Sequence, residues 1–364
     1  MPKKALVIGA GIHGSTAAIE LGRAGYSVLV VDAQPDLFMG TSGASHNRIH
    51  LGHHYPRSRE TILECRDGHA YFKENFGESL TYPEFYYVIH KERSRTSTAE
   101  YRAIMDEHNL PYQEEWPDEY FLDRSKIDSS FRVQEAYFDV IKLRELIKVK
   151  FAELGITTRF SFPIKEVSRD DNRITLTSAS GETLETEADL IVNATYTNTN
   201  ALQKAFGTTD HLTEYEYENT EVAVVASERE LPALTVMDGP FITVMPYGGH
   251  PGQYVIYDVV NSVVSRTFGY DHVPETKRES NWAEMRKHGM EYYPFFKDLT
   301  YVRSLWANRP IPLRKEAQTN DSRATRIVRH DYPIPFYSIL EGKLVSAPLA
   351  AVELLKQIKK ETGE

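Results

Sequence analysis

The sequence has a single cysteine, no long apolar run and no excess of positive charge. Cys65 alone cannot form an internal disulfide or a cysteine-rich metal site, and no metal site is expected. The absence of any run of about 18 apolar residues argues against a membrane span. A formal net charge of −10 argues against nucleic acid or an anionic membrane surface as the main partner. A strand-like run starts almost at the N-terminus without a signal peptide, so a cytoplasmic location is expected.

The first 32 residues carry the strongest functional pattern in the chain. An apolar run at 4–8 breaks into the glycine-rich turn 9–14 (GAGIHG), and a helical pattern and a second apolar run then lead to Asp32. In such a unit the first glycine permits the tight turn, the second lets a pyrophosphate approach the backbone, and the third lets the helix pack on the sheet. The helix N-terminus favours phosphate, and the acidic residue binds ribose hydroxyls. The pattern predicts a bound dinucleotide, and both NAD and FAD fit it.

The rest of the 364 residues is long enough for a second domain. A loop at 33–55, rich in Gly, Ser, His and Asn, is too long for a plain connector and is expected to be functional. A buried strand at 189–195 ends in small residues, which allow close approach of a cofactor. Strand patterns at 85–90 and between 222 and 268 favour an antiparallel sheet, and 347–360 reads as a closing helix.

Four blocks of this sequence form a recognisable set. They are GAGIHGSTAAIELGRAGYSVLVVD at the N-terminus, TSGASHNRIHLGHHY (41–55), ADLIVNAT (188–195), and the C-terminal pair WANRPIP and YSILEGKLVSA. The set resembles the D-amino-acid-oxidase-like superfamily of FAD-dependent oxidoreductases, nearest to the FAD-dependent glycerol-3-phosphate dehydrogenase and L-2-hydroxyglutarate oxidase branch. The loop and the C-terminal blocks favour FAD over NAD. Two departures, Ala-Thr-Tyr at 194–196 where the family usually has a glycine and Glu-Gly-Lys at 341–343, favour hydroxy substrates over amines.

The resemblance implies an α/β fold with two interleaved parts. A Rossmann-like FAD-binding domain is expected at 1–80, 133–205 and 301–364, and an α+β substrate domain built on an antiparallel sheet at 81–132 and 206–300. Gly342 and Lys343 precede the last helix, whose free N–H groups would face the charge of a reduced flavin. The backbone around Val167 would pair with the adenine edge. The predicted cofactor-binding residues are Gly9, Gly11, Ile12, His13, Gly14, Asp32, Ala33, Thr41, Ser42, Ser45, Asn47, Arg48, Val167, Ala194, Thr195, Gly342, Lys343 and Leu344.

His50 is the predicted catalytic base. Oxidation of a CH–OH group by hydride transfer requires removal of the hydroxyl proton, and imidazole has a suitable pKa. Related enzymes carry an Ile-His-x-Gly element beside the flavin, and here His46, His53 and His54 surround it in sequence. A metal site in this cluster is disfavoured because no carboxylate or cysteine joins it at ligand spacing.

Four further residues are predicted to act on the substrate. Arg309 resembles the family arginine that precedes a proline, and a guanidinium can bind a carboxylate or phosphate; a structural ion pair is the alternative. Tyr55, Tyr247 and Tyr257 are predicted to line the substrate face, although each alone also fits a packing aromatic.

The predicted function is that of an FAD-dependent oxidoreductase. It would oxidise a CH–OH or CH–NH bond of a small polar substrate by hydride transfer to flavin N5, with oxygen or another acceptor reoxidising the flavin. Three alternatives stay open: an amine or amino-acid oxidase, an NAD(P)-linked dehydrogenase, and a non-catalytic flavin-binding partner in a larger complex.

Overall fold

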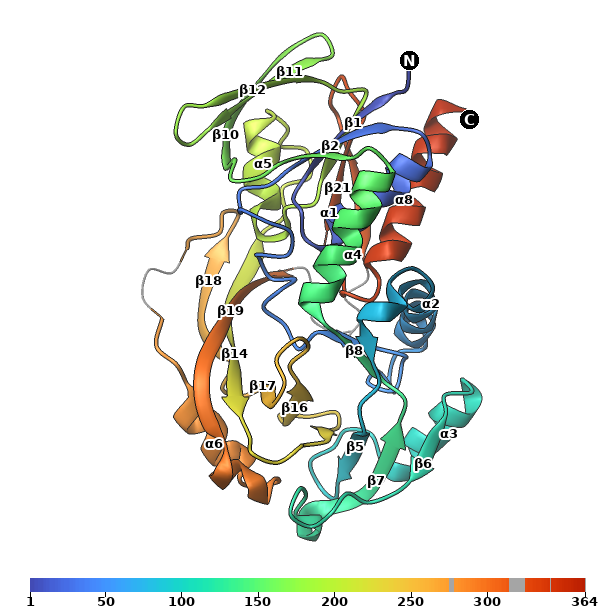
Figure 1. Cartoon of the computed structure of the whole chain (residues 1–364), viewed down its shortest axis with the longest axis vertical. Helices are drawn as coiled ribbons and strands as arrows, with labels where there is room; N and C mark the ends of the chain where they lie inside the picture. Colours follow the sequence, from blue (N-terminus) through green and yellow to red (C-terminus); the bar gives the residue numbers. More distant parts are fainter. Residues whose placement is uncertain (275–277, 314–324, 341, 364) are drawn as a thin grey trace.

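The computed structural model describes residues 1–274, 278–313, 325–340 and 342–363. Glu341, in the predicted C-terminal turn, lies outside them. The molecule is elongated, with both termini at one end beside a largely parallel sheet and a larger sheet toward the other end (Figure 1). None of the helices in the described part of the chain is long and apolar enough to cross a bilayer.

A six-stranded sheet in the order β20-β21-β13-β1-β2-β9 forms the first half. Its strands pair in parallel except for β20 and β21. The central strands are buried along their length because each face is covered, as is usual for parallel sheets. The strands are β1 (Lys4–Ile8), β2 (Ser27–Val31), β9 (Thr157–Arg159), β13 (Leu190–Asn193), β20 (Arg326–His330) and β21 (Phe336–Leu340).

Alternation along β1 divides its side chains between two cores. Ala5 and Val7 pack with four helices, whereas Leu6 and Ile8 pack beneath a separate small sheet, since successive side chains point to opposite faces. The helices are α1 (Ile12–Arg23), α2 (Arg59–Phe76), α4 (Val140–Glu153) and α8 (Ala347–Thr362). On the opposite face lie α5 (Thr199–Ala205) and the sheet of β10 (Ile164–Asp170), β11 (Arg173–Ser178) and β12 (Thr183–Glu187).

A nine-stranded sheet forms the second half, in the order β18-β14-β17-β16-β15-β5-β7-β6 with β19 also paired to β14. Its described pairings are antiparallel except for β5 with β15. The strands are β5 (Phe85–His90), β6 (Tyr112–Glu114), β7 (Ile127–Val133), β14 (Tyr215–Ala226), β15 (Ala233–Val236), β16 (Ile242–Pro246), β17 (Gln253–Asp258), β18 (Val263–Gly269) and β19 (Thr300–Pro312). Helix α3 (Thr98–Glu107) packs on one face and α6 (Trp282–Gly289) on the other.

A short sheet joins the two halves and positions the long loop. It has the order β3-β8-β4, from β3 (Arg48–Ile49), β8 (Ala136–Phe138) and β4 (Leu80–Thr81). The antiparallel register pairs Ile49 with Ala136. The next residues outward, His50 and Glu135, therefore lie opposite each other. Short 3₁₀ helices complete the connections: η1 (Gly77–Ser79), η2 (Arg124–Lys126), η3 (Tyr196–Asn198) and η4 (Pro294–Asp298).

The predicted fold class is confirmed: a Rossmann-like unit combined with a largely antiparallel sheet. The division into domains stays a prediction. Strand β19, assigned by the sequence to the FAD-binding part, pairs along its length with β14 of the nine-stranded sheet. Helix α4 begins at Val140 because the Asp139 carboxylate accepts hydrogen bonds from the amides of Ile141 and Lys142.

Candidate active site

The glycine-rich turn leaves no room for side chains at two of its glycines. Gly9 has a φ of +105°, and a Cβ built on it would lie 2.5 Å from the carbonyl oxygen of Ala194. A Cβ on Gly14 would lie 1.8 Å from the carbonyl oxygen of Gly9. Helix α1 therefore begins directly against the carboxyl ends of β1 and β13, as the motif requires.

Gly11 differs because the position that a Cβ would occupy on it is largely open. Among the described residues, only the Ser42 hydroxyl oxygen comes within 4 Å of a Cβ built there, at 3.1 Å. The same hydroxyl accepts a hydrogen bond from the Ile12 amide at 3.0 Å, which brings the loop after β2 to the start of α1. Asp32 also closes on this turn: its carboxylate accepts from the amides of Ala10 at 2.5 Å and Gln34 at 2.7 Å. Burial raises the pKa of Asp32 despite these bonds.

The C-terminal turn reaches the same place. Gly342 has a φ of +98°, and a Cβ there would lie 3.2 Å from Cε1 of His13. Nδ1 of His13 is buried without a hydrogen-bond partner among the described residues, and burial lowers the pKa of His13 to about 4. The Lys343 amide donates to the Ser346 hydroxyl at 3.0 Å, and its Nζ lies 3.5 Å from Glu64 and 5.2 Å from the centre of the Tyr55 ring. The two ends of the chain therefore meet, as the sequence predicted.

The end of β13 completes the rim of the turn. The Ala194 amide donates to the Ile8 carbonyl, and the Thr195 hydroxyl donates to Asn193 Oδ1 at 2.7 Å. Tyr196 follows with a φ of +55°, a left-handed conformation that glycine adopts without strain. The family that the sequence resembles usually has a glycine in this turn, and a φ of +55° is one that glycine would adopt.

The loop 41–55 is fixed from both halves of the molecule. The Thr41 hydroxyl donates to the Asn308 carbonyl on β19, and the Ser45 hydroxyl bonds the Asn47 side chain at 3.1 Å. Asn47 is fully buried with a φ of +55°, and its Nδ2 has no partner among the described residues. Arg48 is buried and donates to the hydroxyls of Tyr87 at 3.2 Å and Thr235 at 3.0 Å.

His50 lies where this loop enters the interior. Its Nδ1 is 3.2 Å from Oε2 of Glu135, and its ring stacks on His54 at 5.0 Å and meets Tyr55 edge-on at 5.1 Å. Nε2 has no hydrogen-bond partner among the described residues, and the side chain keeps 13% of its surface exposed. Burial lowers the pKa of His50, and Arg48 and Lys343 add to this, whereas Glu135 opposes it. No group of three or more His, Cys, Asp or Glu with metal-binding geometry occurs in the described ranges.

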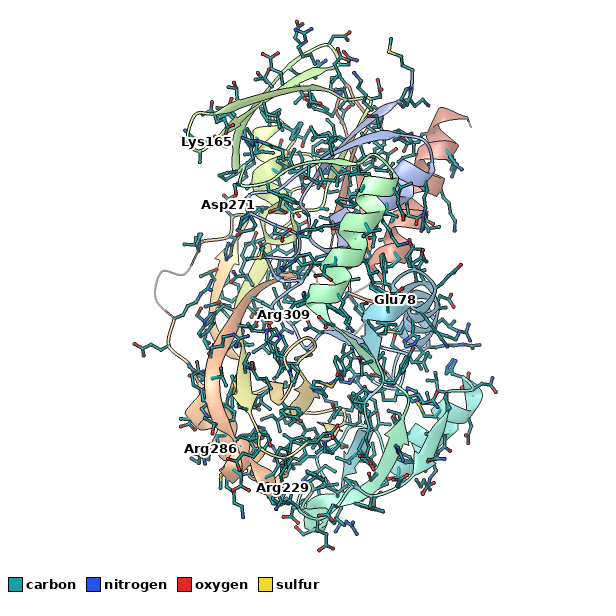
Figure 2. The ribbon with its side chains drawn as sticks, in the orientation of Figure 1. Glu78, Lys165, Arg229, Asp271, Arg286 and Arg309 are labelled. Atoms are coloured by element: carbon teal, nitrogen blue, oxygen red, sulfur yellow. The ribbon has the colours of Figure 1, made fainter. Side chains whose placement is uncertain are left out.

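Arg309 lies near the middle of the long axis of the molecule, on β19 (Figure 2). Both its Nε and its Nη2 donate to Oε2 of Glu218, and Arg266 contacts the other carboxylate oxygen of Glu218 at 3.2 Å. The guanidinium also lies 5.6 Å from the centre of the Tyr257 ring, and Tyr257 meets His46 at 4.8 Å. The ion pair that the sequence left open is therefore present, and the substrate role of Arg309 stays a prediction.

The other predicted residues form no hydrogen bond, ion pair or ring contact with His50 or with the glycine-rich turn in the described part of the chain. Tyr247 is buried and stacks on His250 with ring centres 4.1 Å apart. Val167 lies on β10 and packs beneath the parallel sheet, while Ala33 is exposed just after Asp32. Leu344 packs against the helical core beside Lys343.

Sequence reasoning did not select Glu135 or Tyr87. Glu135 stands in the run VQEAYF between two strands, where nothing local separates it from a surface glutamate. The pairing of β3 with β8 alone places it at His50.

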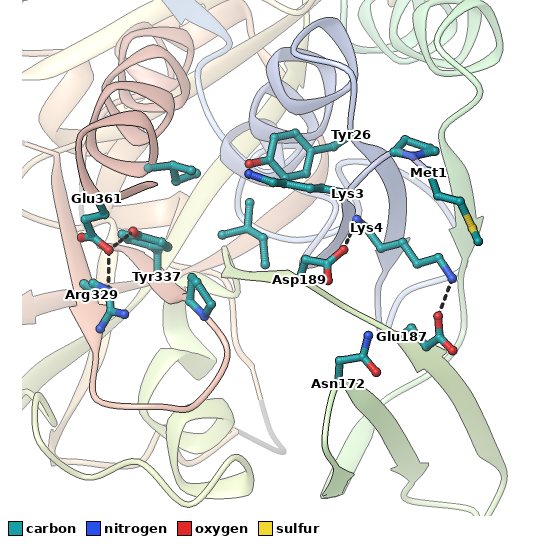
Figure 3. A pocket seen from close by; sticks show the side chains of 14 residues that line it. Met1, Lys3, Lys4, Tyr26, Asn172, Glu187, Asp189, Arg329, Tyr337 and Glu361 are labelled. Carbon is teal, nitrogen blue, oxygen red and sulfur yellow. Dashed lines mark hydrogen bonds and ion pairs between the residues drawn. The ribbon is translucent and has the colours of Figure 1, made fainter. Parts of the chain in front are cut away.

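A surface cavity of about 530 Å³ lies at the amino ends of the parallel strands, opposite the glycine-rich turn (Figure 3). Its wall includes Lys4, which pairs with Glu187 at 2.6 Å and donates its amide to Asp189, at the amino ends of β1 and β13. Arg329 and Glu361 form a second ion pair there at 2.6 Å. Ligands of open α/β sheets bind at the carboxyl ends of the strands, so this cavity is separate from the candidate site.

Comparisons with known proteins agree with this geometry. A family model for FAD dependent oxidoreductases matches residues 4–330. The chain is 24% identical to the FAD-dependent monooxygenase FPY4 of Fusarium mangiferae, over 98% of this chain and 91% of the relative. Its structure is similar to FAD-bound L-alpha-glycerophosphate oxidase from Mycoplasma pneumoniae, with a TM-score of 0.75 and 15% identity over 98% and 94% of the two chains. Glycine oxidase from Geobacillus kaustophilus gives a TM-score of 0.74 with 13% identity over 98% and 95%.

Proposed function

The chain belongs to the family of FAD dependent oxidoreductases, and we propose that it oxidises a CH–OH bond of a small polar substrate with His50 as the proton acceptor. FAD is the cofactor, and when bound it accepts the hydride that leaves the substrate carbon. The residues of the glycine-rich turn fit this group. The backbone at Gly11 is open to a pyrophosphate, and the Asp32 carboxylate is held for a ribose. His13 offers an Nδ1 that has no hydrogen-bond partner among the described residues.

The chain itself supplies the proton transfer and the surroundings of the reacting bond. The hydroxyl proton passes to Nε2 of His50, while the C–H bond breaks toward the cofactor and a carbonyl forms. Lys343 brings a buried positive charge beside Tyr55 and the C-terminal turn, and this charge would stabilise the negative charge of a reduced flavin bound there. Tyr55 and His54 pack against the His50 ring and keep water from two of its sides.

The observation that carries the proposal is the state of the two nitrogens of His50. Nδ1 faces a carboxylate and Nε2 faces no described partner, so a neutral ring presents its lone pair to the site. A neutral amine substrate would not need a proton acceptor such as His50, because its nitrogen already carries a lone pair that can assist hydride transfer. The geometry therefore favours hydroxy substrates over the amine and amino-acid alternative.

The test measures the anaerobic loss of flavin absorbance at about 450 nm after addition of 2-hydroxy acids, polyols, amines or amino acids. We expect a hydroxy compound to reduce the bound flavin, and His50→Ala to keep FAD but slow reduction by about 100-fold or more. His211→Ala, at a half-exposed histidine, is the matched control and should reduce at the wild-type rate. Full-rate reduction of His50→Ala, or reduction by amines alone, would contradict the proposal.

A second candidate is monooxygenation, which the similarity to the Fusarium enzyme favours. Monooxygenation inserts one atom of O₂ into the product and reduces the other to water with two electrons from an added donor such as a reduced nicotinamide, whereas oxidation of CH–OH to a carbonyl adds no oxygen atom. Turnover under ¹⁸O₂ should leave an oxidase product unlabelled, whereas a monooxygenase product would carry one labelled atom.

A further inference from the structure

Glu135 is fully buried, and hydrogen-bond donors reach both of its carboxylate oxygens. Oε2 faces His50 Nδ1 at 3.2 Å and accepts from the Tyr87 hydroxyl at 2.7 Å. Oε1 accepts from the Leu51 amide at 3.3 Å and faces Nδ1 of His53 at 3.7 Å. A buried carboxylate is costly unless such partners satisfy it, and here they come from the loop, from β5 and from the residues beside β8.

The partners keep Glu135 ionised. Burial opposes ionisation, but the hydrogen bond and charge of His50 and the charge of Arg48 outweigh it and hold the pKa of Glu135 well below its usual range. Arg48 acts partly through Tyr87, whose hydroxyl accepts from the guanidinium and donates to the carboxylate. The carboxylate is therefore an acceptor only, and the group opposite it must donate.

That requirement decides which nitrogen of His50 carries the proton. A neutral imidazole has one N–H, and the carboxylate draws it to Nδ1, which leaves Nε2 as the acceptor. When Nε2 takes up a proton, the imidazolium charge forms 3.2 Å from a fixed negative charge that does not have to reorganise. The same logic governs histidine–carboxylate pairs in unrelated hydrolases.

We propose that Glu135 is a positioning residue that fixes the His50 ring with Nε2 as the proton acceptor and stabilises the protonated ring. This proposal rests on the function proposed for His50. The alternative is that Glu135 only neutralises the buried Arg48, in which case the tautomer and basicity of His50 would not depend on it.

The experiment uses the FAD-loaded protein labelled with ¹⁵N-histidine. The imidazole nitrogen shifts report the tautomer and the titration midpoint of His50, which is assigned by its loss in His50→Gln. In the wild-type protein we expect the Nδ1–H tautomer. Glu135→Gln should lower the midpoint by about 1 pH unit or more, because the favourable charge is removed.

Tyr87→Phe provides an independent variant with the opposite sign. It leaves the carboxylate in place but removes its 2.7 Å donor, so Glu135 interacts more strongly with His50 and the midpoint should rise. The other charged and titratable groups near His50, namely Arg48, Lys343, His46, His54 and Tyr55, are retained in both variants, and Tyr87→Phe also removes the hydroxyl that accepts a hydrogen bond from Arg48. Glu119→Gln, at an exposed glutamate, is the control and should leave the midpoint unchanged.

Flavin reduction by the same hydroxy probes completes the test. We expect Glu135→Gln to slow reduction about tenfold or more and to move the pH dependence of the rate with the His50 midpoint. An unchanged midpoint and tautomer in Glu135→Gln would overturn the proposal for Glu135. A shifted midpoint with unchanged reduction would support the positioning of His50 but refute His50 as the base, so the two proposals fail separately.

Discussion

Gly342 packs against His13, so that a Cβ on the glycine would lie only 3.2 Å from Cε1 of the imidazole, although the two residues belong to opposite ends of the chain. The contact closes one side of the glycine-rich turn with the segment that leads into α8. It also explains why the last helix packs directly on α1 in the first core.

Gly342→Ala should weaken FAD binding. The residue has a φ of +98°, and the new Cβ would lie 2.3 Å from the Thr325 hydroxyl as well as against His13, so both backbone strain and crowding oppose it. We expect a loss of about 1–3 kcal/mol in FAD binding free energy, measured by flavin fluorescence titration. Gly25→Ala is the matched control, since its φ is +88° but no described residue other than its chain neighbours has an atom within 4 Å of its Cβ. Equal FAD affinity in the two variants would contradict this prediction.

Gly14→Ala and Gly11→Ala should separate folding from cofactor binding. The Gly14 Cβ would meet a backbone oxygen at 1.8 Å, which cannot move cheaply, so we expect the flavin-free protein to lose about 3 kcal/mol or more. The Gly11 Cβ meets only a hydroxyl at 3.1 Å among the described residues, so the flavin-free protein should change by less than about 1 kcal/mol while FAD affinity falls. Urea unfolding and FAD titration of both variants measure this, and a stability loss at Gly11 as large as at Gly14 would refute it.

Replacing Tyr196 by glycine should destabilise the protein less than replacing it by alanine. Both substitutions remove the ring, but alanine keeps the strain of a φ of +55°, whereas glycine releases it. We expect Tyr196→Gly to be more stable than Tyr196→Ala by about 1 kcal/mol in urea unfolding. At an ordinary φ the order is reversed, so a more stable alanine variant would show that the strain is absent.

The stability of the flavin-free protein should fall as the pH drops below about 6.5. Burial holds the pKa of His13 at about 4, and burial also lowers those of His46 and His54 well below their usual value. Between the folded and unfolded pKa values only the unfolded chain binds the proton, so stability rises with pH across this window and is lost on acidification. For His13 the largest loss of unfolding free energy on acidification is about 3 kcal/mol.

His13→Asn should reduce this pH dependence in urea unfolding between pH values of about 7 and 4.5. The half-exposed His211→Asn serves as the control and should retain the wild-type slope. If His13→Asn keeps the full slope of stability against pH, the partly buried, neutral His13 does not contribute to that slope.

The sequence by itself determined the strand–turn–helix unit, the place of Asp32 and the presence of a second, largely antiparallel sheet. These features are local: glycine spacing, apolar runs and strand alternation depend on residues close together in the chain. The chain contact between the two ends was also predictable, through the resemblance of the C-terminal block to a flavin-binding segment.

Only the tertiary structure decided which side chains meet. The register of β3 with β8 places Glu135 opposite His50, and the pairing of β14 with β19 places Arg309 beside Glu218, where the two form an ion pair. A strand shifted by one residue would turn these side chains to the opposite face, and nothing in the local sequence fixes that register. The chemistry of His50 thus depends on a partner that comes from packing between segments far apart in the chain.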